Sequence, residues 1–258
     1  MNRIDQLFQQ KKNHILSVYF TAGHPELNST VDILAELQAT GTDMVEIGMP
    51  FSDPLADGPV IQDSSTKALR NGMSIKLLFE QLKNVREKIN MPLLLMGYVN
   101  PVLQYGVEKF CIKCRETGID GVILPDLPID LYQQSFQQYF EANGLRFIFF
   151  ITPQTSDERI KMIDAISSGF TYMVSSSSTT GVKTTIADKQ IAYFERIKKL
   201  NLTKPRVIGF GISNHDTFVH ACKYANGAII GSAFVKMLND NTNWRKGIRE
   251  FIKTIIPN

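Results

Sequence analysis

Three acidic residues lie in the stretch EIGMPFSDPLADGP, which runs from Glu46 to Pro59. Glu46 belongs to an apolar run with the character of a β-strand, and side chains alternate between the two sides of a strand. Glu46 therefore shares one side with Met44 and Gly48. A carboxyl group on the inner side of a strand loses water, which raises its pKa and allows it to give and take a proton near neutral pH. The alternative is a structural Glu paired with a Lys or Arg.

The loop after this run, PFSDPLADGP, carries the other two acids, Asp53 and Asp57. Its prolines restrict the backbone, and Gly58 gives freedom beside Asp57. A loop of this length after a strand is typical of a lid or a binding surface. The plainer interpretation is that both acids are solvated surface carboxylates.

Two glycine elements late in the chain suit a phosphate group. GFGIS, from Gly209 to Ser213, ends one apolar run, and IIGSAFVKML places Gly231 and Ser232 between another run and a helical segment. Exposed backbone N–H groups at the start of a helix bind anions. Neither element matches a dinucleotide fingerprint or a P-loop. Tight turns with no ligand are the alternative.

Other candidate residues carry weaker signals. Tyr172 opens YMVSSSSTTGVK on a strand-like run, where its hydroxyl would reach a polar substrate, and the Ser/Thr run that ends at Gly181 is typical of a mobile loop or of a surface linker. Cys111 and Cys114 have CxxC spacing within a helical pattern, which favours two buried thiols over a metal or redox pair. The histidines have no ligand-like spacing, so we expect no metal.

The elements that would position these residues repeat regularly. Apolar runs with almost no polar interruption indicate strands that are covered on both faces. Helical segments separate them, several of which begin after Ser29, Ser74 or Ser156 as N-cap candidates. The eight runs begin at His14, Asp43, Met91, Asp120, Arg146, Phe170, Pro205 and Asn226.

Eight β-α units in 258 residues predict a single-domain (β/α)8 TIM barrel over residues 1–258, with an extra N-terminal helix from Asn2 to Lys12 that would plug its bottom. A doubly wound open sheet is the alternative. In a barrel, function collects at the C-terminal ends of the strands, which is where the motifs above fall.

Bulk properties exclude several classes of function. The formal net charge is only +3 and the basic residues are scattered, which argues against binding to nucleic acid or to an anionic membrane. The polar N-terminus lacks the apolar core of a signal peptide, and the longest apolar stretches reach about half a membrane span. We therefore expect a cytoplasmic protein.

Five motifs, in order through the chain, resemble the tryptophan synthase alpha chain family: VEIGMPFSDPLADGPVIQ, MGYVNPVLQYG, DGVILPDLP, GFGIS and GAIIGSAFVK. The resemblance implies a lyase that cleaves indole-3-glycerol phosphate to indole and glyceraldehyde 3-phosphate in tryptophan biosynthesis. Glu46 and Asp57 match the catalytic acids of the family, and Tyr172 matches its active-site tyrosine.

The resemblance also implies substrate-binding residues. Gly181, Gly211, Gly231 and Ser232 would hold the phosphate through backbone amides, and Thr180 would help to close its loop onto Asp57. Tyr98 and Ile61 would line the indole pocket. The chain departs from the family at STTG, where Gly-Val-Thr-Gly is usual, and at GHP, where Gly-Asp-Pro is usual.

The same resemblance implies a partner chain and implies which of the two chains binds a cofactor. The family works with a beta chain, in an assembly of two alpha and two beta chains, and pyridoxal phosphate belongs to the beta chain alone. Two rival hypotheses remain: a different phosphate-sugar barrel enzyme, or a binding subunit that mainly activates a beta partner.

Overall fold

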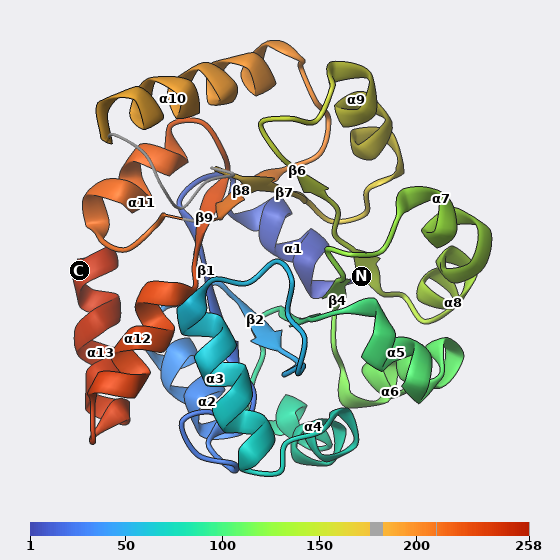
Figure 1. The fold of residues 1–258 in the computed structure, drawn as a ribbon, viewed down its shortest axis with the longest axis vertical. Helices are drawn as coiled ribbons and strands as arrows, with labels where there is room; N and C mark the ends of the chain where they lie inside the picture. Colours follow the sequence, from blue (N-terminus) through green and yellow to red (C-terminus); the bar gives the residue numbers. More distant parts are fainter. Residues whose placement is uncertain (176–182, 210, 258) are drawn as a thin grey trace.

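Parallel strands in the middle of the protein carry a ring of helices around them (Figure 1). The computed structural model describes residues 1–175, 183–209 and 211–257. The strands pair in the order β5-β4-β3-β2-β1-β9-β8-β7-β6. They are β1 (Ile15–Thr21), β2 (Met44–Gly48), β3 (Leu93–Met96), β4 (Gly121–Ile123), β5 (Arg146–Phe147), β6 (Phe150–Ile151), β7 (Thr171–Val174), β8 (Arg206–Gly209) and β9 (Gly227–Ile230).

The two edge strands, β5 and β6, are halves of one segment that is interrupted only at Ile148 and Phe149. The first half pairs with β4 and the second half pairs with β7. The interruption is bonded on both sides, since Ile148 N donates to Val122 O at 3.1 Å and Tyr172 N donates to Phe149 O at 2.9 Å. The sheet therefore closes on itself, so the predicted eight-stranded barrel is confirmed and the open sheet is excluded.

The helices form the outer layer and mostly follow the predicted segments. Ser74 and Ser156 cap α4 and α9 with their side chains, as predicted. Ser29 is the N-cap residue of α2, as predicted, but its hydroxyl donates to Glu26 O and does not cap the helix. The helices are α1 (Arg3–Gln10), α2 (Thr30–Ala39), α3 (Pro59–Arg70), α4 (Ile75–Leu82), α5 (Val99–Tyr105), α6 (Val107–Thr117), α7 (Ile129–Leu131), α8 (Gln137–Ala142), α9 (Asp157–Ile166), α10 (Lys183–Lys199), α11 (His215–Cys222), α12 (Ser232–Asp240) and α13 (Trp244–Ile255), with a short 3₁₀ helix at Val85–Glu87 and a short π-helix at Tyr132–Phe136.

The extra helix α1 closes the N-terminal end of the barrel, as the sequence predicts. Its buried residues Ile4 and Phe8 join the core inside the barrel. The ring of Phe8 lies 5.7 Å from that of Phe170, just before β7, and Asn2 Nδ2 donates to Asp120 O, just before β4. Because this end is filled, the opposite end, where the strands terminate, is the one left for a ligand.

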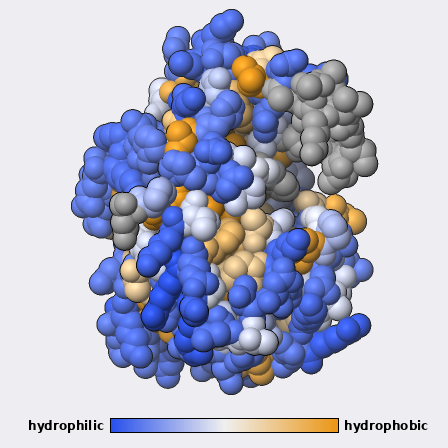
Figure 2. Space-filling model, turned by 90° about the vertical axis from the view of Figure 1, so that its left-hand side faces the viewer, coloured by the Kyte–Doolittle hydropathy of each residue, from blue (hydrophilic) through white to orange (hydrophobic). Residues whose placement is uncertain are grey.

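Alternation along β1 separates two cores. Ile15 and Tyr19 pack inside the barrel, whereas Leu16, Val18 and Phe20 pack against the helices. The helices turn polar residues outward, and Figure 2 shows a mostly hydrophilic surface on the side that carries α11, α12 and α13 in Figure 1. Within the described residues, no helix is both long and apolar enough to cross a membrane.

Candidate active site

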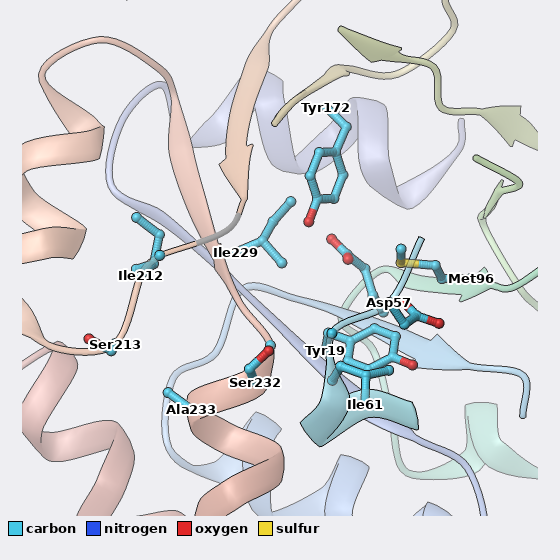
Figure 3. A pocket seen from close by; sticks show the side chains of 14 residues that line it. Tyr19, Asp57, Ile61, Met96, Tyr172, Ile212, Ser213, Ile229, Ser232 and Ala233 are labelled. Atoms are coloured by element: carbon cyan, nitrogen blue, oxygen red, sulfur yellow. The ribbon is translucent and has the colours of Figure 1, made fainter. Parts of the chain in front are cut away.

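A cavity of about 230 Å³ opens at the C-terminal ends of the strands. Figure 3 shows Tyr19, Ile61 and Met96 on one side of it, Ser213, Ser232 and Ala233 on the other, and Tyr172 pointing in between them. Most of the lining comes from the ends of strands and from the loops that follow them. The lining residues are Tyr19, Glu46, Asp57, Gly58, Ile61, Met96, Tyr172, Gly211, Ile212, Ser213, Ile229, Gly231, Ser232 and Ala233.

Glu46 points into this cavity from β2, as the alternation of the sequence predicts. Its side chain is fully buried, and burial raises the pKa of its carboxyl group from 4.5 to about 8. A hydrogen bond from Ser17 Oγ to Glu46 Oε1, at 3.0 Å, opposes part of this rise. Within the described residues, Glu46 forms no salt bridge, and its Oε2 has no hydrogen-bond partner. The structural alternative, a Glu paired with a Lys or Arg, is therefore not supported.

Asp57 enters the cavity from the loop between β2 and α3. Tyr98 Oη donates to Asp57 Oδ2 at 3.0 Å, and Ala56 N donates to Tyr98 Oη at 3.0 Å, so the phenol fixes the acid and its backbone together. Burial raises the pKa of Asp57, and the hydrogen bond from Tyr98 opposes this rise. Asp53, by contrast, is exposed and does not line the cavity, so only one of the two loop acids faces a ligand.

Two phenols reach the cavity wall because two strands end in glycine. An added Cβ at Gly48 would lie 2.2 Å from Tyr19 Oη, and one at Gly209 would lie 2.1 Å from Tyr172 Oη. No side chain fits at such distances, so the glycines of β2 and β8 are required by close approach rather than by backbone conformation. Burial raises the pKa of both phenols, which keeps them neutral hydroxyl groups.

The opposite wall is built from backbone. Gly231 stands at the N-cap of α12 and Ser232 begins the helix, whose first amide groups have no partner within the helix. Gly211 adopts φ +79° in the loop after β8, and Ile212 and Ser213 continue that loop along the cavity. The two glycine elements predicted from the sequence thus meet at one cavity. Together they offer N–H groups and a helix N-terminus to an anion.

The remaining predicted residues divide into three groups. Ile61 lines the cavity from the first turn of α3. Tyr98 lines a small adjoining cavity instead, together with Tyr19, Asp57 and Met96. Thr180 and Gly181 lie outside the described residues.

Sequence reasoning missed Ser17 and Tyr19, which alternate with apolar residues along β1. The same rule that placed Glu46 inside the barrel would have placed them there. The CxxC pair lies within α6, where both thiols are buried and burial raises the pKa of Cys111 to about 12. Among the described residues, no three His, Cys, Asp or Glu side chains gather in a way that would hold a metal ion.

Comparison with known proteins places this chain in a family. The family model for the tryptophan synthase alpha chain matches residues 5–254. The chain belongs to the tryptophan synthase alpha chain family. The tryptophan synthase alpha chain of Flavobacterium psychrophilum is 59% identical over 93% of this chain and 95% of its own length. That of Flavobacterium johnsoniae is 57% identical over 99% of this chain and 100% of its own length.

Solved structures of the same family share the fold. Tryptophan synthase subunit alpha from Legionella pneumophila has a TM-score of 0.88 at 30% identity and covers 99% of this chain and 97% of its own. A chain of the tryptophan synthase complex from Pyrococcus furiosus has a TM-score of 0.86 at 31% identity and covers 96% of this chain and 100% of its own. The sequence resemblance to the tryptophan synthase alpha chain family is thereby confirmed over nearly the full chain.

Proposed function

We propose that this chain is the alpha subunit of tryptophan synthase and cleaves indole-3-glycerol phosphate to indole and glyceraldehyde 3-phosphate. One observation carries the proposal: a buried carboxyl with a raised pKa, Glu46, shares a cavity with a second carboxyl, Asp57, and with the free amides at the start of α12. An acid, a base and an anion site are what a retro-aldol cleavage of a phosphorylated substrate needs. We further propose that the chain forms one catalytic domain and works in the cytoplasm.

The two walls of the cavity suit the two ends of this substrate. The phosphate would accept hydrogen bonds from amides of the loop after β8 and of the start of α12, including those near Gly211 and Ser232. The indole ring would lie against the apolar side formed by Ile61 and Met96, beside the ring of Tyr19. This orientation would bring the ring nitrogen toward Asp57 and the glycerol chain toward Glu46.

The chemistry uses one carboxyl twice. Neutral Glu46 donates its proton to C3 of the indole ring, which leaves a positive charge on the ring nitrogen. Asp57 accepts the N–H of that ring and stabilises the charge as it develops. The resulting Glu46 carboxylate then takes the proton of the hydroxyl group next to the ring. The carbon–carbon bond breaks, its electrons restore the neutral indole, and the hydroxyl carbon becomes the aldehyde.

We further propose that a beta chain receives the indole, in an assembly of two alpha and two beta chains. Pyridoxal phosphate would belong to that beta chain, and the cleavage itself requires no cofactor on this chain. Two exposed apolar residues on segments that follow barrel strands support a partner surface: Leu55, two residues before Asp57, is 93% exposed, and Leu103 on α5 is 50% exposed. The similar chain from Pyrococcus furiosus was solved within a tryptophan synthase complex, which supports a partner chain.

Indole release from purified protein tests the proposal. We expect Glu46→Gln to lower kcat by about 10²- to 10⁴-fold, the usual contribution of a general acid–base. Asp57→Asn should cost about 10²- to 10³-fold, because it removes charge stabilisation in the transition state. Asp53→Asn is the matched control, since it removes an exposed acid of the same loop, and should leave the kcat of the isolated chain unchanged.

Wild-type turnover in Glu46→Gln or in Asp57→Asn would refute the assigned mechanism. The assay is run with and without a beta chain, because a subunit that only activates its partner would release little indole alone yet still stimulate the partner. Failure to release any indole under either condition would refute the proposed activity.

A further inference from the structure

The hydroxyl group of Ser17 contacts the carboxyl group of Glu46 inside the barrel. Ser17 lies on β1, the strand beside β2, and pairs in register with Met44, two residues before Glu46. Its side chain is fully buried, and its Oγ lies 3.0 Å from Glu46 Oε1. The other oxygen, Oε2, has no hydrogen-bond partner among the described residues. The two oxygens of one carboxyl therefore have different surroundings.

The direction of the hydrogen bond between Ser17 and Glu46 follows from the acceptors available to the serine proton. A serine hydroxyl has one proton to donate, and within the described residues Glu46 Oε1 is the acceptor within its reach. If Oε1 carried the acid proton and donated it to Ser17, the serine proton would be left buried without an acceptor, which is unfavourable. Oε1 therefore accepts from Ser17 whether Glu46 is neutral or ionised, and the acid proton resides on Oε2.

We infer that Ser17 is a positioning residue that holds Oε1 of Glu46 and thereby reserves Oε2 for proton transfer to and from the substrate. The inference rests on the proposed function, in which Glu46 first gives and then takes a proton. With Oε1 fixed, the carboxyl group does not need to rotate between the two steps. The same oxygen delivers a proton to C3 of the ring and receives the proton of the neighbouring hydroxyl group.

Several groups face Glu46, and the hydrogen bond to its carboxyl that the described residues show comes from Ser17. Tyr19 on β1 and Tyr172 on β7 interact with it electrostatically and remain neutral, because burial raises the pKa of both. Asp57 shares the cavity from the loop after β2. The bond from Ser17 favours the ionised carboxyl, so its removal should raise the pKa of Glu46 further.

The test measures kcat and KM for indole release against pH in Ser17→Ala. We expect kcat to fall about ten- to a hundredfold, as for the loss of a hydrogen bond to a charged group, while KM stays within about twofold. The alkaline limb of the kcat profile should move upward by about one pH unit, equal to a tenfold change in the proton equilibrium. Ser17→Thr keeps the hydroxyl, so both its kcat and the position of the alkaline limb of its kcat profile should match the wild type.

Two further variants separate positioning from simple packing. Ser17→Cys fills the same space with a weak donor, so it should shift the profile in the same direction without leaving a void. Thr171→Val removes a buried hydroxyl from the helix-facing side of β7 and should leave the profile unchanged.

Wild-type kcat and an unmoved profile in Ser17→Ala and Ser17→Cys would overturn the inference. So would an equal change in Thr171→Val. Glu46→Gln separates a failure of the role of Ser17 from a failure of the proposed mechanism. If it is inactive while the Ser17 variants behave as wild type, only the role of Ser17 fails. If it retains turnover, the proposed mechanism itself fails.

Discussion

Replacement of Glu46 by Gln should change the pH dependence of stability. The free energy of unfolding of Glu46→Gln, compared with that of the wild type, should increase from pH 5 to pH 8. The folded-state pKa of Glu46, about 8, lies above the value of 4.5 that applies to an unfolded chain. Between these values the unfolded protein releases the proton while the folded protein keeps it. Wild-type stability therefore falls as pH rises through this window, and no such effect exists below pH 4.5.

The magnitude follows from the two pKa values. Each pH unit between the two pKa values lowers the free energy of unfolding of the wild type by about 1.4 kcal/mol. Because titration is gradual near each pKa, the total loss between pH 5 and pH 8 is roughly 3–4 kcal/mol. Gln does not ionise in either state, so the difference in unfolding free energy between Glu46→Gln and the wild type should grow by this amount.

Urea denaturation at pH 5, 6, 7 and 8 measures this difference, because other titrating groups cancel between the two proteins. Glu46→Met is the matched control: it also cannot ionise, so it should give the same slope with a different offset. A difference that stays flat from pH 5 to pH 8 would show that Glu46 is ionised in the folded barrel, and the assignment of a neutral acid at this position would be wrong.

Two further predictions concern the residues around the acids. Tyr98→Phe removes the donor to Asp57 and the acceptor for Ala56 N, so kcat/KM for indole release should fall about ten- to a hundredfold; an unchanged value would show that the loop holds Asp57 without this phenol. Gly209→Ala places a Cβ 2.1 Å from Tyr172 Oη and should destabilise the protein by about 1–3 kcal/mol in urea titrations, whereas Gly58→Ala, whose Cβ meets nothing within 4 Å, should not.

Much of the fold could be predicted from the sequence because the local hydrophobic patterns of the strands and helices agree with the barrel that they form. The strands are buried on both faces, so their apolar runs stand out against amphipathic helices. The alternation rule then placed Glu46 inside the barrel with no knowledge of its neighbours. Glycines and a helix start near Gly211 and Gly231 indicated the cavity wall that is built from backbone, because such a wall leaves its mark in local sequence.

Contacts between distant segments could not be predicted in this way. The bond between Tyr98 and Asp57 joins two different β-α loops, and nothing in either loop specifies the pairing. Ser17 and Glu46 belong to neighbouring strands whose register is fixed only when the barrel closes. The interruption at Ile148 and Phe149 also depends on closure, since the segment must leave β4 and join β7 within a few residues.

The energetics of Glu46 argue that its position is functional. A buried carboxyl with one neutral donor is costly, and an apolar side chain of similar size would fill the same space without that cost. Structural acids avoid the cost by pairing with a cation, as Asp120 does with Arg86 near the N-terminal end of the barrel. Glu46 forms no such pair among the described residues, yet it faces a cavity whose opposite wall presents free amides. A group that lowers stability near neutral pH, where its proton can also be transferred, supports the acid–base chemistry proposed above, because the described side chains around it provide no structural role.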